Sequence, residues 1–176
     1  MNAHTEPIAR KEAGTGTLDL DAVFREQYPR MAGVIRRIVR DPSRAEELAV
    51  DVFCKLWKAG DVHPGALHAW LYTTSVRAGL DELRRRNRRQ RYERFFRPWR
   101  SPRTPDELHS IGEQQRQVRT TLAALKRREA EILVLRNEGL SYEDIAHAIG
   151  VRPASVGTLL RRAREAFRNE YRRRYD

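Results

Sequence analysis

Polar side chains near the C-terminal end are spaced to contact a nucleic acid. Ser155, Thr158, Arg161 and Arg162 fall on one side of a helix that repeats about every 3.6 residues, and Arg152 lies just before them. Hydroxyl groups exchange hydrogen bonds with base edges, and a guanidinium group forks onto guanine or clamps a phosphate. These residue types in this order predict a helix that enters the DNA major groove with its N-terminus first.

This helix needs a support for its opposite, apolar side. The preceding stretch, GLSYEDIAHAIG, predicts a short helix that Ser141 caps and that ends at Gly150, where the chain needs a positive φ. Pro153 suits the first turn of the second helix, because its missing N–H is not needed there. Together the two predict a helix-turn-helix, and an ordinary helical hairpin with a solvated basic face stays open as the alternative. The apolar side consists of Val156, Leu159, Leu160, Ala163 and Phe167.

The overall charge points to the same kind of partner. The 176 residues include 35 Lys and Arg against 24 Asp and Glu, a formal net charge of +11. Most of the excess is arginine, whose planar fork suits phosphates and base edges better than the point charge of lysine does. A polyanionic partner is therefore expected.

Features of a membrane or secreted protein are missing from the sequence. No segment approaches roughly 18 uninterrupted apolar residues, and the N-terminal stretch has no apolar signal-peptide core. The single cysteine, Cys54, excludes an internal disulfide and fits a reducing compartment. We therefore expect a cytoplasmic protein without a membrane contact.

Helical periodicity accounts for most of the N-terminal half. Residues 1–17 are polar and aperiodic, which predicts a mobile tail. Apolar residues at three- and four-residue steps predict a first helix from Leu18, with Pro29 as a kink. A capping box of Ser43 and Glu46 predicts the start of a second helix.

A third predicted helix begins near Leu67 and runs into a strongly basic stretch. Nine arginines fall between Arg84 and Arg100, and so many like charges on one helix are destabilising unless something negative lies against them. Three prolines then end the periodicity, which predicts a flexible linker at residues 95–112. Helical periodicity returns over residues 113–176, and no strand-like alternation is sustained. The predicted fold class is therefore all-α, with two small helical domains.

Three segments resemble the bacterial sigma factors of RNA polymerase. AEELAVDVFCKLW at residues 45–57 and WLYTTSVRAGLDELRRRNRR at residues 70–89 resemble their region 2, and residues 123–164, which contain the helix-turn-helix, resemble their region 4. The segments follow the family's order with no room for region 3, which is typical of the extracytoplasmic-function (ECF) group of the sigma-70 family. The resemblance implies region 2 at 18–94 and region 4 at 113–176.

The resemblance also implies a division of labour. In the family, region 2 docks on the clamp helices of the largest subunit of core RNA polymerase, and region 4 meets the polymerase flap and the minus-35 element. The polar positions of residues 45–57 lie off the apolar stripe and are free for such a contact. The polymerase-binding candidates are Glu46, Glu47, Asp51 and Lys55.

The loop and helix that follow correspond to the part of the family that reads the minus-10 element as a single strand. One base is flipped into a pocket there, and the pocket and nearby cations must offset the cost of unstacking. The candidates are His63, Leu67, His68, Trp70, Tyr72, Thr73 and Arg77. For Trp70, a place in the apolar core is the alternative, because it shares the stripe of Leu71.

The basic stretch contributes a second kind of DNA contact. Arg84, Arg85 and Arg88 are candidates to grip duplex phosphates beside the opened strand, and a solvated helix end is the alternative. The linker is basic and aromatic, where we expect an acidic or neutral one. The sequence also departs from the family pattern at Val50, Val76, Arg77, Lys126 and Gly157.

Other classes of protein fit less well. The sequence has no GxxxxGK[ST] phosphate loop and no paired metal spacing among its five histidines, so we predict no enzyme, no cofactor and no metal. A zinc site of Cys54, His63 and His68 is a weak alternative to a small buried thiol with two loop histidines. A stand-alone helix-turn-helix regulator is the closer rival, but it leaves about ninety N-terminal residues unexplained. The expected partners are core RNA polymerase and promoter DNA, and an anti-sigma factor is a further candidate.

Overall fold

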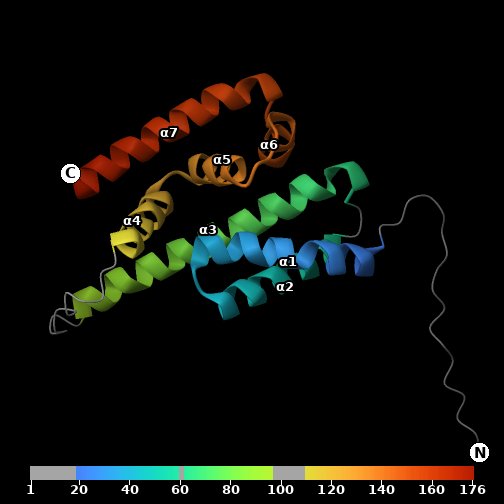
Figure 1. The fold of residues 1–176 in the computed structure, drawn as a ribbon, viewed down its shortest axis with the longest axis horizontal. Coiled ribbons are helices and arrows are strands. Elements are labelled where there is room, and N and C mark those ends of the chain that lie inside the picture. The colour runs from blue at the N-terminus through green and yellow to red at the C-terminus, as the bar shows by residue number, and fades with distance from the viewer. Residues whose placement is uncertain (1–18, 60–61, 97–109) are drawn as a thin grey trace, which may run out of the picture.

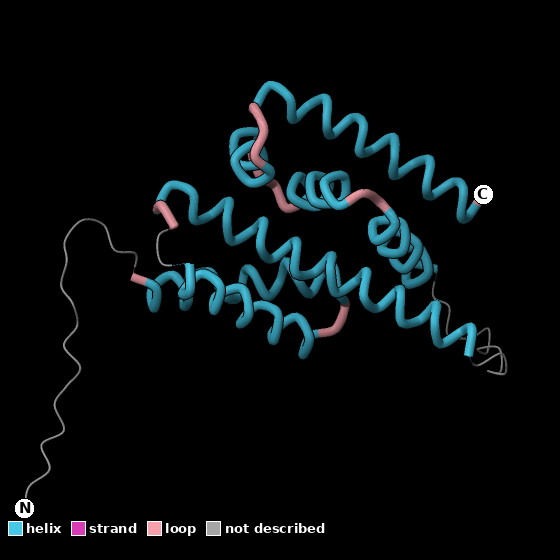
Figure 2. Tube along the Cα trace, turned by 180° about the vertical axis from the view of Figure 1, so that it is seen from behind, coloured by secondary structure: helices cyan, strands magenta, loops and turns pink. Residues whose placement is uncertain are grey.

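A computed structural model describes residues 19–59, 62–96 and 110–176, and all regular elements among them are α-helices (Figure 1, Figure 2). The predicted tail at 1–17 and most of the predicted linker at 95–112 lie outside the described residues. The all-α prediction is confirmed for the described part. The helices are α1 (Leu20–Val39), α2 (Pro42–Ala59), α3 (Pro64–Phe96), α4 (Ser110–Ala124), α5 (Arg127–Asn137), α6 (Tyr142–Ile149) and α7 (Pro153–Tyr175).

The first helix starts where an aspartate caps it. α1 begins at Leu20, two residues later than predicted, because Asp19 takes the N-cap position. Its carboxylate accepts hydrogen bonds from the backbone N–H groups of Asp21 and Ala22. Pro29 lies inside α1, which continues past the proline to Val39.

The start of α2 corrects the prediction of a Ser43 capping box. α2 begins at Pro42, and the carboxylate of Asp41 accepts a hydrogen bond from the backbone N–H of Arg44 at 3.1 Å. Proline suits this first helical position because it has no N–H to satisfy, and aspartate is as good a cap as serine. Asp41 and Ser43 are thus both suitable N-caps for α2. The proline between them favours Asp41, because it occupies the first helical position.

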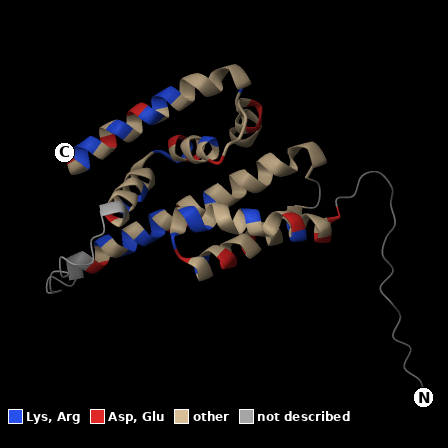
Figure 3. Cartoon of the chain, viewed as in Figure 1, with Lys and Arg blue, Asp and Glu red and all other residues tan. Residues whose placement is uncertain are grey.

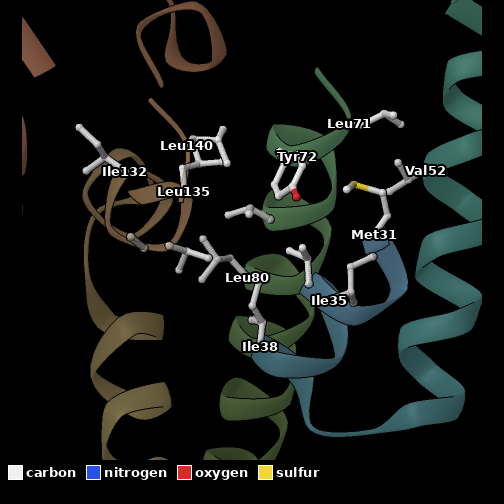
Figure 4. Close-up of a cluster of buried hydrophobic side chains, with 14 of the residues drawn as sticks. Met31, Ile35, Ile38, Val52, Leu71, Tyr72, Leu80, Ile132, Leu135 and Leu140 are labelled. Atoms are coloured by element: carbon white, nitrogen blue, oxygen red, sulfur yellow. The ribbon is translucent and has the colours of Figure 1, made fainter. Parts of the chain in front are cut away.

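Three helices form an N-terminal unit, α1–α3, around a continuous apolar core. Met31 and Ile35 of α1, Val52 of α2, and Val76 and Leu80 of α3 are fully buried. Burying each such side chain contributes roughly 1.5–3 kcal/mol relative to leaving it exposed. Figure 4 shows this core on the side of α3 that faces α1 and α2.

The long helix α3 runs further than the sequence predicts. It is a single helix of 33 residues that carries most of the basic stretch and ends at Phe96. α4 in turn begins at Ser110, inside the predicted linker of 95–112. The predicted linker of 95–112 thus overlaps the last two residues of α3 and the first three of α4, and the rest of it lies outside the described residues.

The remaining helices form a C-terminal unit, α4–α7. Ile132 and Leu135 of α5, Ile145 of α6, and Val156 and Leu160 of α7 are almost completely buried. α7 contacts α4, α5 and α6, so one face of this long helix is covered by the rest of the unit. The support that the apolar side of the second helix requires is thus present.

The two units share α3 as a common wall. This helix contacts α1 and α2 on one side and α4, α5 and α6 on the other, and α7 is the outermost helix (Figure 1, Figure 2). Figure 4 shows Tyr72 and Leu80 of α3 between Leu135 and Leu140 on one side and Ile35 on the other. The described helices of the two predicted domains therefore pack on one another.

Candidate nucleic-acid interface

The polar side of α7 is exposed, as the helical spacing predicts. Val156, Leu160 and Ala163 are buried against the rest of the C-terminal unit. The guanidinium of Arg161 lies 3.8 Å from the carboxylate of Glu165, a distance at which an exposed pair contributes little. The residues of the predicted DNA-contacting face are all exposed: Arg152, Ser155, Thr158, Arg161 and Arg162.

Local interactions fix the angle between α6 and α7. The Ser141 hydroxyl accepts a hydrogen bond from the backbone N–H of Asp144 at 3.0 Å, and the Asp144 carboxylate accepts one from the backbone N–H of Ser141 at 3.3 Å. Gly150 ends α6 with a φ of 66°, and Pro153 begins α7. The predicted cap, turn and restart are confirmed. The guanidinium of Arg128 donates a hydrogen bond to the Ile149 carbonyl at 2.8 Å and so stabilises the turn between α6 and α7.

Gly157, one of the positions that depart from the family pattern, lies next to Tyr142 of α6. A Cβ added at Gly157 would lie 3.7 Å from the Tyr142 ring of α6, an ordinary van der Waals contact. This position of α7 therefore lies near α6. The first atoms of a basic side chain in place of Gly157 would lie beside the Tyr142 ring.

Positive charge concentrates on two elements. Figure 3 shows Lys and Arg along the second half of α3 and the later turns of α7, whereas the first turns of α7 carry mainly uncharged residues. Small uncharged side chains at the start of a helix allow the close approach that reading base edges requires. The charge distribution matches a helix that reads bases with its first turns and contacts phosphates with later ones.

Carboxylates within the chain neutralise part of the basic stretch on α3. Arg84 donates to the Leu125 carbonyl at 3.4 Å and lies 3.4 Å from the Asp81 carboxylate. Arg85 pairs with Glu82, while Arg88 is exposed. The sequence-based expectation that something negative lies against this run is thus met in part by the protein's own side chains.

The pKa of Glu82 reflects this arrangement. Burial raises the pKa of Glu82, but hydrogen bonds from Arg85 and Arg44 outweigh it and hold the pKa below its ordinary value. The Glu82 carboxylate therefore stays ionised and screens the arginines beside it. Of the three predicted phosphate-binding residues, Arg84 is engaged within the protein, whereas Arg85 and Arg88 present their side chains to solvent.

The exposed members of the predicted minus-10 set lie just before α3 and in its first turns. His63 is exposed, and its Nδ1 accepts a hydrogen bond from the backbone N–H of Gly65 at 3.2 Å. His68 is exposed, with its ring centroid 4.7 Å from that of Tyr72. Leu67 and Trp70 are half-buried and pack against the core. Trp70 thus packs against the core and is partly exposed.

The other members of that set are two buried residues and one partly exposed arginine. Tyr72 and Thr73 are buried, and the Thr73 hydroxyl donates to the Ala69 carbonyl at 2.6 Å. Arg77 is half-buried and pairs with Glu131 of α5. Sequence reasoning missed Glu131, although a glutamate next to the apolar run of α5 is a signal that it needs a buried partner.

The predicted polymerase-binding residues all lie on the exposed side of α2. Glu46, Glu47, Asp51 and Lys55 are exposed, and Glu47 pairs with Arg44. An open, mainly apolar groove of about 530 Å³ runs beside them between α1 and α2, and sequence reasoning did not predict it. Its lining includes the exposed side chains Phe24, Val50 and Trp57.

Four arginines from both units gather where α4 meets the end of α1. Burial, and then the positive charges of Arg40, Arg116 and Arg86, lower the pKa of Arg119. Arg40 contacts Gln115 of α4, and Arg86 of α3 donates to the Val39 carbonyl at 3.1 Å, which brings the three elements together. The positive charges of these four arginines repel one another.

Arg119→Gln is therefore expected to stabilise the protein, by about 0.5 kcal/mol in low salt. The reason is the removal of repulsion from a half-buried cation. Thermal unfolding in low and high salt tests this, because salt screens the repulsion and should shrink the difference. Arg164→Gln, at an exposed position on α7, is the matched control. A lower Tm for Arg119→Gln than for wild type in low salt would contradict the prediction.

Both units correspond to known regions of one family. Residues 23–89 match the family described as Sigma-70 region 2, and residues 115–167 match the one described as Sigma-70, region 4. The chain belongs to the sigma-70 family. The exposed face of α7 lies in the region 4 match, and α2 and most of α3 lie in the region 2 match. The resemblance seen in the sequence is confirmed.

Two curated relatives are sigma factors of the ECF group. The chain is 25% identical over 154 residues to the ECF RNA polymerase sigma factor SigE of Mycolicibacterium smegmatis, covering 85% of this chain and 60% of that protein. It is 26% identical over 176 residues to the ECF RNA polymerase sigma factor SigK of Mycolicibacterium vanbaalenii, covering 96% and 89%. The chain thus spans about 60% of the length of the SigE relative.

Two solved structures share the fold. CnrH, in complex with the cytosolic domain of CnrY, superposes with a TM-score of 0.54 at 18% identity and 85% coverage of each chain. The sigma factor RpoE, in complex with the anti-sigma factor NepR from Bartonella quintana, gives a TM-score of 0.50 at 20% identity, covering 88% of this chain and 97% of that one. At these identities the likeness concerns the fold. Among the described residues of this sigma-70 family member, no helix is long and apolar enough to cross a bilayer.

Proposed function

We propose that this protein is an ECF-type sigma factor, a non-catalytic subunit that binds core RNA polymerase in the cytoplasm and selects the promoters at which transcription begins. The observation that supports the proposal is the presence of two exposed, arginine-bearing elements on one chain of the sigma-70 family. One is the polar face of α7, and the other is the arginine-rich half of α3. Two such elements fit two separate promoter sites.

In this proposal each element has its own part of the promoter. α7 enters the minus-35 major groove, where Ser155 and Thr158 meet base edges and Arg161 and Arg162 fork onto guanine or clamp phosphates. The start of α3 holds the minus-10 strand, and Arg85 and Arg88 grip the neighbouring phosphates. The protein supplies recognition and strand capture, and the polymerase supplies the chemistry.

Polymerase docking is assigned to α2 and region 4. The exposed carboxylates Glu46, Glu47 and Asp51, with Lys55, are proposed to meet the clamp helices of the largest subunit, and region 4 is proposed to meet the flap. Charged side chains at the rim of an interface mainly steer and orient the partner. Of two structurally similar proteins, the sigma factor RpoE was solved in complex with the anti-sigma factor NepR, and CnrH in complex with the cytosolic domain of CnrY. An anti-sigma partner is therefore a further part of this proposal.

Arg161→Ala or Arg162→Ala is expected to weaken promoter binding by about 1–3 kcal/mol if the side chain forks to guanine, with relaxed preference at one base pair. If the side chain contacts a phosphate, its loss would instead weaken binding to all sequences equally. The magnitude of the slope of log K against log salt would then decrease by about 1. Fluorescence anisotropy on duplexes selected from a promoter library distinguishes the two. Arg164→Ala removes the same charge one turn further along α7 and serves as the control. Unchanged affinity and salt slope in both variants would refute the assigned face.

A further inference from the structure

Four arginines that the proposed function leaves unassigned meet where α4 lies against the end of α1. Arg40 caps the end of α1, Arg86 belongs to the second half of α3, and Arg116 and Arg119 lie on α4. Burial, and then the positive charges of the other three, lower the pKa of Arg119, so the four guanidinium groups act on one another. Three helices thus bring four cations from distant parts of the sequence to one place.

Two of the four arginines have partners within the protein. Arg86 donates hydrogen bonds to the Val39 carbonyl at 3.1 Å and to the Asp41 carboxylate at 3.0 Å. A cation suits the C-terminal end of a helix, so these bonds account for Arg86 as a residue that stabilises α1. The Arg116 guanidinium lies 3.6 Å from the Glu113 carboxylate of its own helix, a weak pair at the surface.

The other two, Arg40 and Arg119, form no ion pair with a carboxylate of the described part of the chain. Arg40 contacts the neutral amide of Gln115, and Arg119 is half-buried. The carboxylates of Asp41 and Glu113 compensate two of the four arginines and leave the cluster with a formal charge of +2. A cluster with this excess charge attracts an anion that carries at least two negative charges.

The backbone conformation of Arg40 adds to the cost of the cluster. Its φ of 56° lies in the left-handed region, and among the residues that the structure describes Arg40 is the one non-glycine residue with a positive φ. Glycine or asparagine is usual at such a helix end, because a longer side chain is unfavourable in this conformation. An arginine here and the repelled, half-buried Arg119 both lower stability. Local strain that a fold retains in this way is typical of a functional site.

We propose that Arg40, Arg86, Arg116 and Arg119 form a binding site for a small polyphosphate anion, of the kind that nucleotides carry. Guanidinium forks bind phosphate oxygens through paired hydrogen bonds, and adjacent phosphate groups supply the negative charge that the cluster lacks. Cations that converge from three helices suit a compact anion better than a DNA strand, along which single charges are spread about 3.4 Å apart. The site uses no residue assigned to DNA or polymerase and is therefore an addition to the proposed function.

Thermal unfolding and isothermal titration calorimetry of the full-length protein test this site. The probes are inorganic triphosphate, GTP and orthophosphate, each at constant ionic strength and without a divalent cation, so that general screening is equal. The variant is Arg40→Gly with Arg119→Gln. It removes the two arginines that have no ion pair, and glycine suits the positive φ, so the variant is expected to be at least as stable as wild type without the anion. Arg25→Gln with Arg30→Gln removes the same charge from exposed positions on α1 and is the matched control.

Triphosphate and GTP are expected to raise the Tm of wild type and of the control, because both bind the folded state. The Arg40→Gly/Arg119→Gln variant should bind them at least tenfold more weakly and lose most of the Tm gain. Orthophosphate should bind wild type more weakly than triphosphate does. Equal affinities for triphosphate and GTP would identify the phosphates as the recognised group, and a higher affinity for GTP would identify a nucleotide as the source.

Two results would overturn the inference. One is an equal affinity for triphosphate in wild type and in the Arg40→Gly/Arg119→Gln variant, which would reduce the effect to general attraction by a basic protein. The other is no triphosphate binding by wild type, together with a loss of affinity for a random-sequence DNA duplex in the variant but not in the control. That outcome would make the cluster a contact for the DNA backbone. Neither readout depends on core polymerase, so failure of the proposed function would leave this test unaffected.

Discussion

Gly79→Val is expected to lower the free energy of unfolding by about 3 kcal/mol. Gly79 lies in α3 where this helix crosses α1. A Cβ built there would come within 2.9 Å of Ile38 Cδ1 and 3.2 Å of Ile38 Cβ and Cγ2. Ile38 is a buried, branched side chain with little freedom to rotate. Since protein interiors are close-packed, α3 must shift away from α1 to admit the valine.

Chemical denaturation of the two variants Gly79→Val and Gly33→Val measures this cost. Gly33 lies in α1, where the nearest atom to an added Cβ is Arg37 Nη1 at 3.6 Å, the flexible end of a long side chain. Gly33→Val is therefore expected to change stability by less than about 0.5 kcal/mol. Combined with Ile38→Ala, Gly79→Val should cost less than the sum of the two single changes. Equal effects at Gly79 and Gly33 would show that α1 and α3 do not pack closely.

The triple variant Arg85→Gln, Arg88→Gln and Arg91→Gln is expected to reduce open-complex formation by polymerase at least tenfold at 0.15 M salt. The three arginines are exposed on the second half of α3. The slope of log K against log salt is negative, and each lost phosphate contact makes it shallower by about 0.9. The magnitude of the slope should therefore decrease by about 2–3. Binding of the isolated minus-35 duplex should change much less, because the proposed function assigns that contact to α7.

Strand opening is measured by permanganate footprinting at several salt concentrations. Arg25→Gln, Arg30→Gln and Arg36→Gln together remove the same net charge from exposed positions on α1. This control should leave open-complex formation within about twofold of wild type. Equal losses on duplex binding and strand opening, or equal losses in the control, would refute the division of DNA contacts between α3 and α7.

Sequence reasoning succeeded where the determining forces act within a few residues. The cap at Ser141, the positive φ of Gly150 and the restart at Pro153 follow from backbone geometry alone. The faces of α7 follow from the helical repeat, because its apolar stripe must be buried. The exposed and buried sides of the predicted DNA helix were for this reason readable from the sequence.

It failed where two local solutions competed. Asp41 and Ser43 both suit an N-cap, and the proline between them favours Asp41. The sequence predicts that region 2 ends at residue 94, whereas α3 continues to Phe96. Boundaries of this kind depend on small differences between similar local energies.

Contacts between distant segments were beyond the reach of periodicity. Arg77 and Glu131 are 54 residues apart, and Arg37 and Glu138 are 101 apart. The helical repeat shows which side of a helix is buried, but it does not identify the helix that covers it. The packing of α5 and α6 on the predicted minus-10 residues is therefore a feature that only the structure reveals.

Run-off transcription with purified core RNA polymerase on a promoter library is the most direct test of the central claim. It requires docking, promoter recognition and strand opening by this one chain. We predict transcripts with defined start sites that appear only when the protein is added to core polymerase, and that disappear when Arg161 and Arg162 are both replaced by alanine. The absence of any transcript that depends on the protein, despite duplex binding by α7, would contradict the account.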